Sequence, residues 1–504
     1  MDTTLQYIGC RANIVTVKIK KTTVMQFLEI TLLFSTFFYL ISRVFFNVQI
    51  KKKYVLSILI LILLAHLFIE GCRWQMMPAY LLWIFAIITA IKTSDKRSSI
   101  VGMIFKGIGL LVLGVLGFVF PSIFPVFDLP EPSGKYTVST TDIFLELDRD
   151  EVITTNPDDK RKLMIKAWYP SEEKEGIKDP YIDQGGRHGF AQKYGLPDAT
   201  FNYLDKIETH VFRDLAIAKK QFPVLIFSHG YNSKANNYYA LISEIVSHGY
   251  VVFALNHTYE STGTTFPDGE EVYFDYEYAQ KIEAGTWEDM KKVIESFHDG
   301  SSFEARHPVV KEGLETYFVK DMVEGWAQDI YDVTDHLAQW NTNGFFKDRL
   351  DLSNTGVFGH SRGGGAAGEA LLTDNRLKAG ANIDGVQWGK IVDTSFTDPF
   401  LYISADWPAS KEDLNAHAYI NKSQSVFYEA RVLKTLHSNF MDIPFMIPFQ
   451  SLSEAGDIDP EMGIEITSKL VTSFFDKHLK NKDIDVKALD EKYELLNLTI
   501  YEKE

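Results

Sequence analysis

Four long apolar runs open the chain, and short polar or basic turns separate them. They cover about Phe27 to Phe46, Tyr54 to Glu70, Met77 to Ile91, and Ile108 to Phe120 with its flanks. Each run approaches the roughly 20 residues with which an α-helix crosses the apolar part of a bilayer. Helices on the surface of a soluble domain keep a polar face, and a run such as VLSILILILLAHLF has almost none. We therefore predict a membrane region of about four helices in residues 1–127.

The basic residues beside these runs predict how the helices are oriented. Lys51 to Lys53 follow the first run and segment 92–97 after the third holds three more basic residues, whereas the turn after the second has only Arg73. Because Lys and Arg accumulate in cytoplasmic loops, the chain after the fourth run is predicted to be extracytoplasmic in a multi-pass protein of the cell membrane. The basic leader RANIVTVKIKK conflicts with this orientation. A true start at Met25 would remove the conflict.

A proline-rich segment follows the membrane region. FPSIFPVFDLPEPSGKY contains four prolines, which stop helices and stiffen loops. We predict a linker at residues 128–135.

After the linker, continuous apolar runs alternate with stretches of helical period. The runs typical of buried strands are LMIKAWYP, FPVLIFSHG, YVVFALNH, AGANID, FLYISAD and ARVLKTLH. The stretches with helical period are YALISEIVSHG, EGWAQDIYDVTDHLAQWN, GGGAAGEALLT and TSKLVTSFFDKHLK. Strict alternation of strand and helix predicts a doubly wound, mostly parallel α/β sheet over residues 136–504. We place a cap insertion at about 262–322.

The motif FGHSRGG (358–364) places a serine where a predicted strand meets a predicted helix. The spacing Gly359-x-Ser361-x-Gly363 suits a sharp elbow, because larger side chains at the flanking positions would collide with neighbouring backbone. This junction lies at the carboxyl edge of the sheet, where such sheets bind ligands. Ser361 is therefore the candidate nucleophile.

A serine hydroxyl needs a base to take its proton, and the base needs an orienting acid. In α/β-hydrolases the chain order is Ser, acid, His, and only His417, His437 and His478 follow Ser361. His417 looks helical, and His478 lies in the final amphipathic helix on what we take to be a solvated face. His437 follows the last predicted strand at a loop, so we predict His437 as the base.

Two aspartates remain open as the acid on chain order alone. Asp384 follows the strand after the elbow, and Asp406 follows the next strand, which is the commoner place for the acid in this fold class. Either could instead cap the following helix.

Two backbone N–H groups should stabilise the oxyanion that forms on the attacked carbonyl. One is predicted from Arg362, directly after the nucleophile. The other is predicted from Tyr231 in SHGYN, with Gly230 allowing close approach and His229 shaping the loop.

Charge is distributed unevenly over the 504 residues. Residues 1–127 hold 13 Lys and Arg against 4 Asp and Glu, which gives this part a charge of +9. Because the net charge of the whole protein is −16, the remaining residues carry −25. An acidic body argues against a nucleic-acid partner, because phosphate binding needs clustered basic residues. Only Cys10 and Cys72 are present, which excludes a disulfide framework and a cysteine metal site.

Taken together, the motifs resemble the platelet-activating factor acetylhydrolase family, of the plasma or group VII phospholipase A2 type. The matching stretches are GKYTVSTTDI, MIKAWYPS, FPVLIFSHGYNSKANNYYALISEIVSHGYVVFALNH, GHSRGG, ANIDG, TLHSNF and the terminal helix. The resemblance implies an α/β-hydrolase fold, Ser361 and His437 as nucleophile and base, and Asp384 rather than Asp406 as the acid. It also maps the second oxyanion donor onto Tyr231.

There are departures from the family pattern. Arg362 stands where the mammalian enzymes have an aromatic residue, Tyr231 replaces a leucine, and the membrane region has no counterpart in those secreted enzymes. These changes bear on acyl specificity and leave the acyl-transfer chemistry in place.

The sequence thus predicts a membrane-anchored serine ester hydrolase that needs no metal or cofactor. The resemblance implies short sn-2 acyl groups on phospholipids as substrates. A general carboxylesterase for small soluble esters, with residues 275–297 as the specificity-setting cap, is the alternative in the same class. A catalytically silent membrane receptor or scaffold is the alternative in another class.

Overall fold

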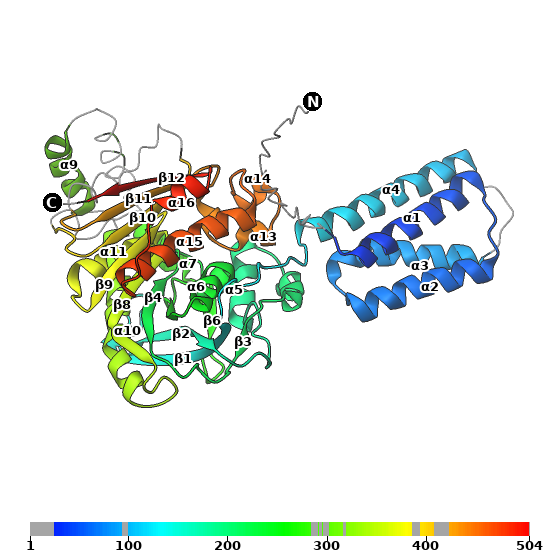
Figure 1. Ribbon diagram of the computed structural model, residues 1–504. Helices are drawn as coiled ribbons and strands as arrows, with labels where there is room; N and C mark the ends of the chain where they lie inside the picture. The colour runs from blue at the N-terminus through cyan, green and yellow to red at the C-terminus, as the bar shows by residue number, and fades with distance from the viewer. Residues whose placement is uncertain are drawn as a thin grey trace, which may run out of the picture.

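The protein is described by a computed structural model that covers residues 25–92, 99–283, 302–315, 319–385, 394–407 and 423–502, with Lys291 and Glu295. A bundle of four helices stands beside a larger body in which helices cover a sheet (Figure 1). The basic leader, most of segment 92–97 and His417 lie outside the described residues.

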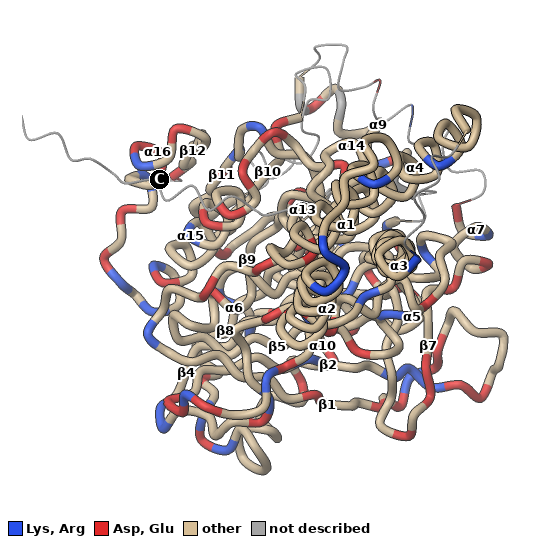
Figure 2. The backbone as a smooth tube through the Cα atoms, turned by 90° about the vertical axis from the view of Figure 1, so that its right-hand side faces the viewer, with Lys and Arg blue, Asp and Glu red and all other residues tan. Residues whose placement is uncertain are grey.

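The four apolar runs form the helical bundle. Its helices are α1 (Phe27–Phe46), α2 (Lys52–Ile69), α3 (Met77–Ile91) and α4 (Ile100–Ile123), with a short helix η1 (Trp74–Met76) before α3. By length and composition, α1, α2, α4 and the combined stretch of η1 and α3 (Trp74–Ile91) are able to cross a membrane. α1 and α3 have the predicted bounds, whereas α4 extends beyond its run at both ends and keeps Pro121 inside its last turn. Most of the bundle is tan in Figure 2, because its helices hold few charged residues.

A buried ion pair closes the end of the bundle that faces the body. Arg73 donates to both carboxylate oxygens of Glu29, over 2.5 and 2.6 Å, and both side chains are almost completely buried. Glu70 accepts from the backbone N–H groups of Leu28 and Glu29 at the start of α1. Charges buried in this way are compensated by partners on neighbouring elements.

The turn between α2 and α3 contacts the body directly. The indole of Trp74 and the amide of Gln75 both donate to the carbonyl of Thr200, over 2.9 and 3.2 Å. Lys206 donates to the Glu70 carbonyl over 3.0 Å. Side-chain hydrogen bonds therefore join the bundle to the body in addition to the chain connection.

The body is built on one large mixed sheet, as the fold prediction expected. The described strands lie in the order β12-β11-β10-β9-β8-β4-β5-β2-β1-β3. Neighbours from β11 through β5 are parallel, and the pairs β5–β2, β2–β1 and β11–β12 are antiparallel. The central strands are β4 (Phe222–Ser228), β5 (Val251–Asn256), β8 (Leu350–His360), β9 (Leu377–Ile383) and β10 (Phe400–Ser404). The outer strands are β1 (Thr137–Asp150), β2 (Lys160–Ser171), β3 (Phe212–Arg213), β11 (Phe427–Val432) and β12 (Leu496–Tyr501).

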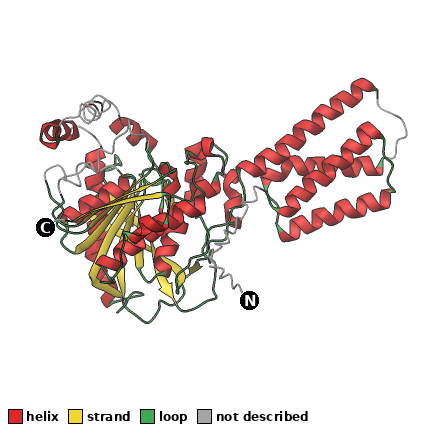
Figure 3. Ribbon diagram, turned by 45° about the horizontal axis from the view of Figure 1, so that its top comes forward, coloured by secondary structure: helices red, strands yellow, loops and turns green. Residues whose placement is uncertain are grey.

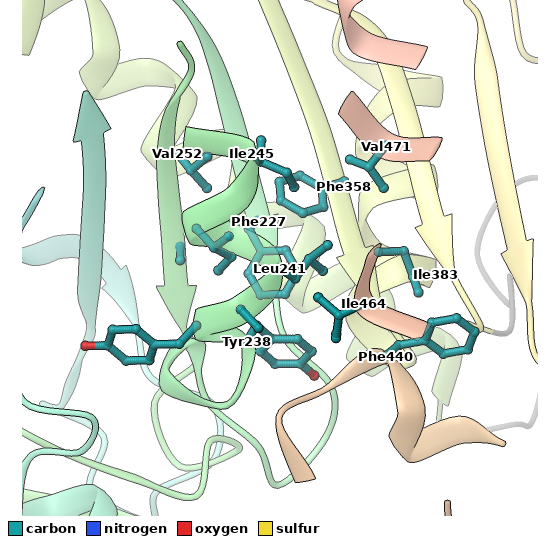
Figure 4. Packing of buried hydrophobic residues seen from close by; sticks show 14 of the residues in the cluster. Phe227, Tyr238, Leu241, Ile245, Val252, Phe358, Ile383, Phe440, Ile464 and Val471 are labelled. Atoms are coloured by element: carbon teal, nitrogen blue, oxygen red, sulfur yellow. The ribbon is translucent and has the colours of Figure 1, made fainter. Parts of the chain in front are cut away.

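Helices cover both faces of this sheet (Figure 3). Side chains of α6 (Tyr239–Ser247) and α15 (Pro460–His478) meet alternate residues of the central strands on one face, as the labelled side chains show (Figure 4). On the opposite face the remaining strand residues pack against α10 (Val319–Thr342) and α11 (Arg362–Thr373). The two buried cores confirm the doubly wound α/β arrangement.

The smaller elements surround this framework. They are α5 (Gln184–Tyr194), η2 (Asp198–Lys206), η3 (Ala235–Tyr238), α7 (Tyr276–Glu283), α9 (Phe303–Glu315), η5 (His437–Phe440), α13 (Ile443–Met446), α14 (Gln450–Ser453) and α16 (Ala488–Lys492). β6 (Gly263–Thr265) and β7 (Glu271–Tyr273) form a separate hairpin at the start of the predicted cap. Much of segment 284–301 lies outside the described residues, so the extent of the cap stays a prediction.

Three details differ from the sequence prediction. The predicted strand ARVLKTLH corresponds to β11, which ends at Val432 and leaves a turn before His437. β1 and β12 were not predicted, because strands at or beside an edge of the sheet carry solvent-facing residues and lack a continuous apolar run. The predicted linker (128–135) has no helix or strand, but Leu129 within it and Phe127 directly before it are buried against the body.

Candidate active site

Ser361 lies at the tip of a sharp turn between β8 and α11. Its backbone has φ 58° and ψ −130°, a strained conformation for a residue with a side chain. A Cβ atom at Gly359 would lie 2.2 Å from the carbonyl oxygen of Gly363, and one at Gly363 would lie 2.2 Å from that of Ser228. Both positions therefore require glycine, and the predicted elbow is present.

His437 and Asp384 face each other beside this elbow. His437 begins η5, and its Nδ1 lies 2.6 Å from Oδ2 of Asp384 across 53 residues of sequence. The other carboxylate oxygen accepts from the backbone N–H of Ala405 and the indole of Trp407, each over 2.9 Å. The Asp384 side chain is 1% exposed and that of His437 is 41% exposed. The acid is thus held rigidly, while the imidazole remains accessible to solvent.

The hydrogen bond to Asp384 assigns the proton of His437. A carboxylate can only accept, so Nδ1 carries the hydrogen and Nε2 is left as the basic nitrogen. This is the tautomer that a serine hydrolase requires of its base.

Strand pairing brings the serine and the acid to one edge of the sheet. β8 and β9 are parallel neighbours, with His360 opposite Ile383, so Ser361 and Asp384 leave adjacent strands at the same level. The backbone N–H of Ser361 donates to the carbonyl of Ile383 over 2.9 Å. The fold thereby sets the separation of the two residues through the sheet.

A chain of hydrogen bonds links the 228–231 segment to the backbone of His437. The N–H of Gly230 donates to the hydroxyl of Tyr238 over 3.0 Å, and that hydroxyl lies 2.9 Å from Nδ1 of His360. Nε2 of His360 lies 3.2 Å from the carbonyl of His437. Burial, together with the nearby His437, lowers the pKa of His360 well below its ordinary value, so this histidine is neutral. Neutral His360 therefore accepts from Tyr238 and donates to His437.

The two predicted oxyanion residues lie close to the serine. Gly230, next to Tyr231, is so close that a Cβ there would lie 3.2 Å from Cβ of Ser361. Arg362 follows the serine directly, and its guanidinium stacks on the ring of Tyr231 at 3.7 Å from the ring centre. Both residues therefore lie close to the serine, as the predicted oxyanion donors require.

Asp406 is turned toward other partners. Its Oδ1 pairs with the guanidinium of Arg431 at 3.0 Å, and its Oδ2 accepts from the backbone N–H of Lys434 over 2.9 Å. The helix that we expected Asp406 to cap falls in segment 408–422, outside the described residues. The hydrogen bond from His437 goes to Asp384 instead.

The other histidines have structural contacts. His478 is half-buried and lies 3.0 Å from the hydroxyl of Tyr428, so its assignment to a solvated face was wrong. Burial lowers the pKa of His478 to about 4. His229 is fully buried, contacts the carbonyl of Gly230 through Nδ1 and accepts from the N–H of His257, in agreement with a loop-shaping role.

Sequence reasoning missed Tyr238 and His360 as part of this site. His360 directly precedes the nucleophile, and that position was the available signal. Tyr238 carried no signal, because its role depends on a contact across 122 residues. Within the described residues, the structure contains no group of three or more side chains suited to bind a metal ion.

Comparisons with known proteins agree with this architecture. The sequence pattern of the family described as platelet-activating factor acetylhydrolase, isoform II, matches residues 124–497. A platelet-activating factor acetylhydrolase of Bos taurus is 25% identical over 385 residues, covering 71% of this chain and 79% of the relative. A probable 1-alkyl-2-acetylglycerophosphocholine esterase of Arthroderma benhamiae is 22% identical over 403 residues, covering 71% of this chain and 89% of the relative.

A solved structure shares the fold. The ferulic acid esterase from Streptomyces cinnamoneus superposes with a TM-score of 0.56 at 22% identity, covering 74% of this chain and 99% of that one. The family match begins at residue 124, so the four apolar helices precede it. The chain therefore belongs to the platelet-activating factor acetylhydrolase, isoform II, family and is a hydrolase that acts on esters.

Proposed function

We propose that this protein is a membrane-anchored serine esterase in which Ser361, His437 and Asp384 form the catalytic triad. The observation that carries the proposal is the 2.6 Å contact between His437 Nδ1 and Asp384 Oδ2 beside a serine on a strained elbow. A nucleophile, a base with the correct tautomer and a buried acid are the groups that acyl transfer through a covalent intermediate needs.

The reaction follows from these positions in two steps. The hydroxyl of Ser361 attacks the ester carbonyl while Nε2 of His437 takes its proton, and that proton then passes to the departing alcohol. Water next attacks the acyl-enzyme as His437 again accepts the proton, and the carboxylic acid leaves as the serine regains its hydrogen. The backbone N–H groups of Tyr231 and Arg362 stabilise the negative oxygen in both steps. Asp384 stabilises the imidazolium.

The proposed substrates are esters with short acyl chains, such as the sn-2 acyl group of phospholipids related to platelet-activating factor. This choice rests on the family and on the activities for which the related proteins of Bos taurus and Arthroderma benhamiae are named. The apolar helices support it, because they would hold the active site near a lipid surface.

Two measurements on the purified protein test the proposal. A fluorophosphonate probe should form an adduct on Ser361, whereas a silent scaffold would leave that peptide unmodified. Activity against esters of increasing acyl length, with and without a phosphocholine head group, should be greatest for short chains on the phospholipid. Equal rates on small soluble esters would favour a general carboxylesterase instead.

A chelator should leave the activity unchanged. The proposed nucleophile and base are protein side chains, so no step draws on a metal-bound water. Initial rates after incubation with EDTA and removal of the chelator test this. Loss of activity that zinc or another divalent ion restores would assign the protein to a metal-dependent class.

Membrane anchoring is supported by the surface of the bundle. Phe38, Leu61 and Phe105 point outward and are 61%, 68% and 72% exposed, and many other large apolar side chains of the four helices are exposed as well. Such a surface is unfavourable in water and suits the hydrocarbon of a bilayer.

The catalytic body is expected on the extracytoplasmic side. The turn with Lys51 to Lys53 lies at the end of the bundle away from the body (Figure 1), so a cytoplasmic position of this turn places residues 134–504 outside. Protease added to intact cells or spheroplasts should therefore degrade the body. If cleavage requires lysis while an outer-surface marker is digested beforehand, the orientation is reversed.

A further inference from the structure

A second serine, histidine and aspartate are connected in the body, separate from the candidate triad. The hydroxyl of Ser228, at the end of β4, lies 2.8 Å from Nε2 of His257, which directly follows β5. Nδ1 of His257 lies 2.7 Å from Oδ2 of Asp329 in the middle of α10. All three residues are completely buried, so an ester cannot reach the Ser228 hydroxyl. The arrangement therefore calls for a role other than nucleophilic attack.

Two arginines hold Asp329 at one end of this hydrogen-bonded series. Arg161 on β2 donates to both oxygens of Asp329, over 3.1 and 2.5 Å, and Arg149 on β1 also donates to it. Burial alone would raise the pKa of Asp329, but Arg161 and His257 hold it below its ordinary range, so the carboxylate is ionised. An ionised carboxylate accepts from Nδ1 of His257 and leaves Nε2 to accept from the Ser228 hydroxyl.

α10 holds the imidazole by a second contact as well. The ring of Trp326, three residues before Asp329 and hence on the same helix face, stacks on His257 at 4.0 Å and 8°. Trp326 in turn donates from its indole to Glu260 over 2.6 Å. His257 thus has a defined ring plane and a defined tautomer, which gives Ser228 a hydrogen-bond acceptor at a set position.

Ser228, at the other end of this hydrogen-bonded series, lies next to the candidate active site. A Cβ atom at Gly363, in the first turn of α11, would lie 2.2 and 2.3 Å from the carbonyl oxygens of Ser228 and His229. A Cβ atom at Gly230 would lie 3.2 Å from Cβ of Ser361, and the residue after Gly230 is Tyr231. His257 also donates its backbone N–H to the side chain of His229 over 3.2 Å. A shift of the 228–231 segment would therefore move the Tyr231 N–H relative to the nucleophile.

We propose that Ser228, His257 and Asp329 are positioning residues that hold the 228–231 segment so that the Tyr231 N–H is aimed at the reacting carbonyl. The inference rests on the proposed function, because it assigns a purpose to these contacts only if Ser361 forms a tetrahedral intermediate. Oxyanion donors contribute through prior alignment, and a displacement of about 1 Å costs roughly 100-fold in rate.

The test is Ser228→Ala, assayed on a short-chain ester. We expect kcat to fall about 10- to 100-fold while KM changes less than about threefold, because the donor acts mainly on the transition state. Binding of a trifluoromethyl ketone analogue, which forms a tetrahedral adduct, should weaken in parallel with kcat. Ser468→Ala is the matched control, because Ser468 is equally buried but bonds within α15 and should leave kcat unchanged.

A second variant tests the same hydrogen bond in case Ser228→Ala does not fold. His257→Asn keeps an N–H group that can serve Asp329 and removes the ring nitrogen that Ser228 uses. It should lower kcat by a similar factor, and the double variant should be little worse than either single one, since both remove the same hydrogen bond. Folded variants with wild-type kcat, or with a lower melting temperature as their sole defect, would overturn the inference. Failure of the proposed function looks different, because the wild-type protein would then lack both esterase activity and the Ser361 adduct.

Discussion

Replacing Ser361 by alanine is expected to lower kcat about a million-fold and to leave the protein folded. The variant loses one hydroxyl, and the elbow around it is set by the close backbone contacts of Gly359 and Gly363. Catalysis that remains would come from the oxyanion donors and substrate binding. The rates of purified wild type and variant on one short-chain ester measure the effect, and circular dichroism reports the fold.

Ser353→Ala provides the matched control for this experiment. It makes the same chemical change in the strand that leads to the elbow, at an exposed position near the start of β8, and should keep wild-type activity. Substantial hydrolysis by the Ser361 variant, free of contaminating esterase, would show that another residue is the nucleophile.

Replacing Asp384 by asparagine is expected to lower kcat about ten-thousand-fold. Asparagine fills the same space, but it would present either an N–H to His437 or a neutral oxygen in place of the carboxylate. The imidazole would then lose its correct tautomer or the charge that stabilises its protonated form. The stability of the variant should change much less than its turnover, which kcat and the melting temperature together will show.

Asp406→Asn is the paired control, because the same substitution is made one strand further along. Asp406 pairs with Arg431 and the N–H of Lys434, and its side chain is 33% exposed. Loss of such an exposed pair costs at most about 1 kcal/mol of stability, and activity should stay within a few-fold of wild type. The reverse ranking of the two variants would place the acid on the strand after Asp384.

Local sequence predicts the elements whose signal is repeated along the chain. The apolar runs of the bundle are long and continuous, so the bounds of α1 and α3 follow from composition alone. The buried central strands and the glycine spacing around Ser361 are similarly local, because each reflects a requirement of the residue's own neighbourhood. β1 was not predicted, because exposed and buried positions mix along this strand, which lies beside the short edge strand β3.

The acid that accepts the hydrogen bond from His437 could not be predicted from local sequence. Asp384 and Asp406 each follow a strand in the parallel part of the sheet, and chain order allows either as the acid. The fold distinguishes the two residues. Asp406 pairs with Arg431 and accepts from the backbone N–H of Lys434, whereas Asp384, in the turn after β9, accepts from the imidazole of His437. The family resemblance pointed the same way, but through analogy and without naming these contacts.

The sequence by itself determined the fold class, the four apolar helices and the candidates Ser361 and His437, because continuous hydrophobic patterns and tight glycine spacing act over a few residues. Only the tertiary structure decided which aspartate faces His437 and placed His360 and Tyr238 beside the site. It alone also showed that Asp329, on a helix of mixed polar and apolar residues, is completely buried against His257. These outcomes depend on hydrogen bonds between residues 53 to 122 positions apart, and packing of the whole sheet sets their geometry.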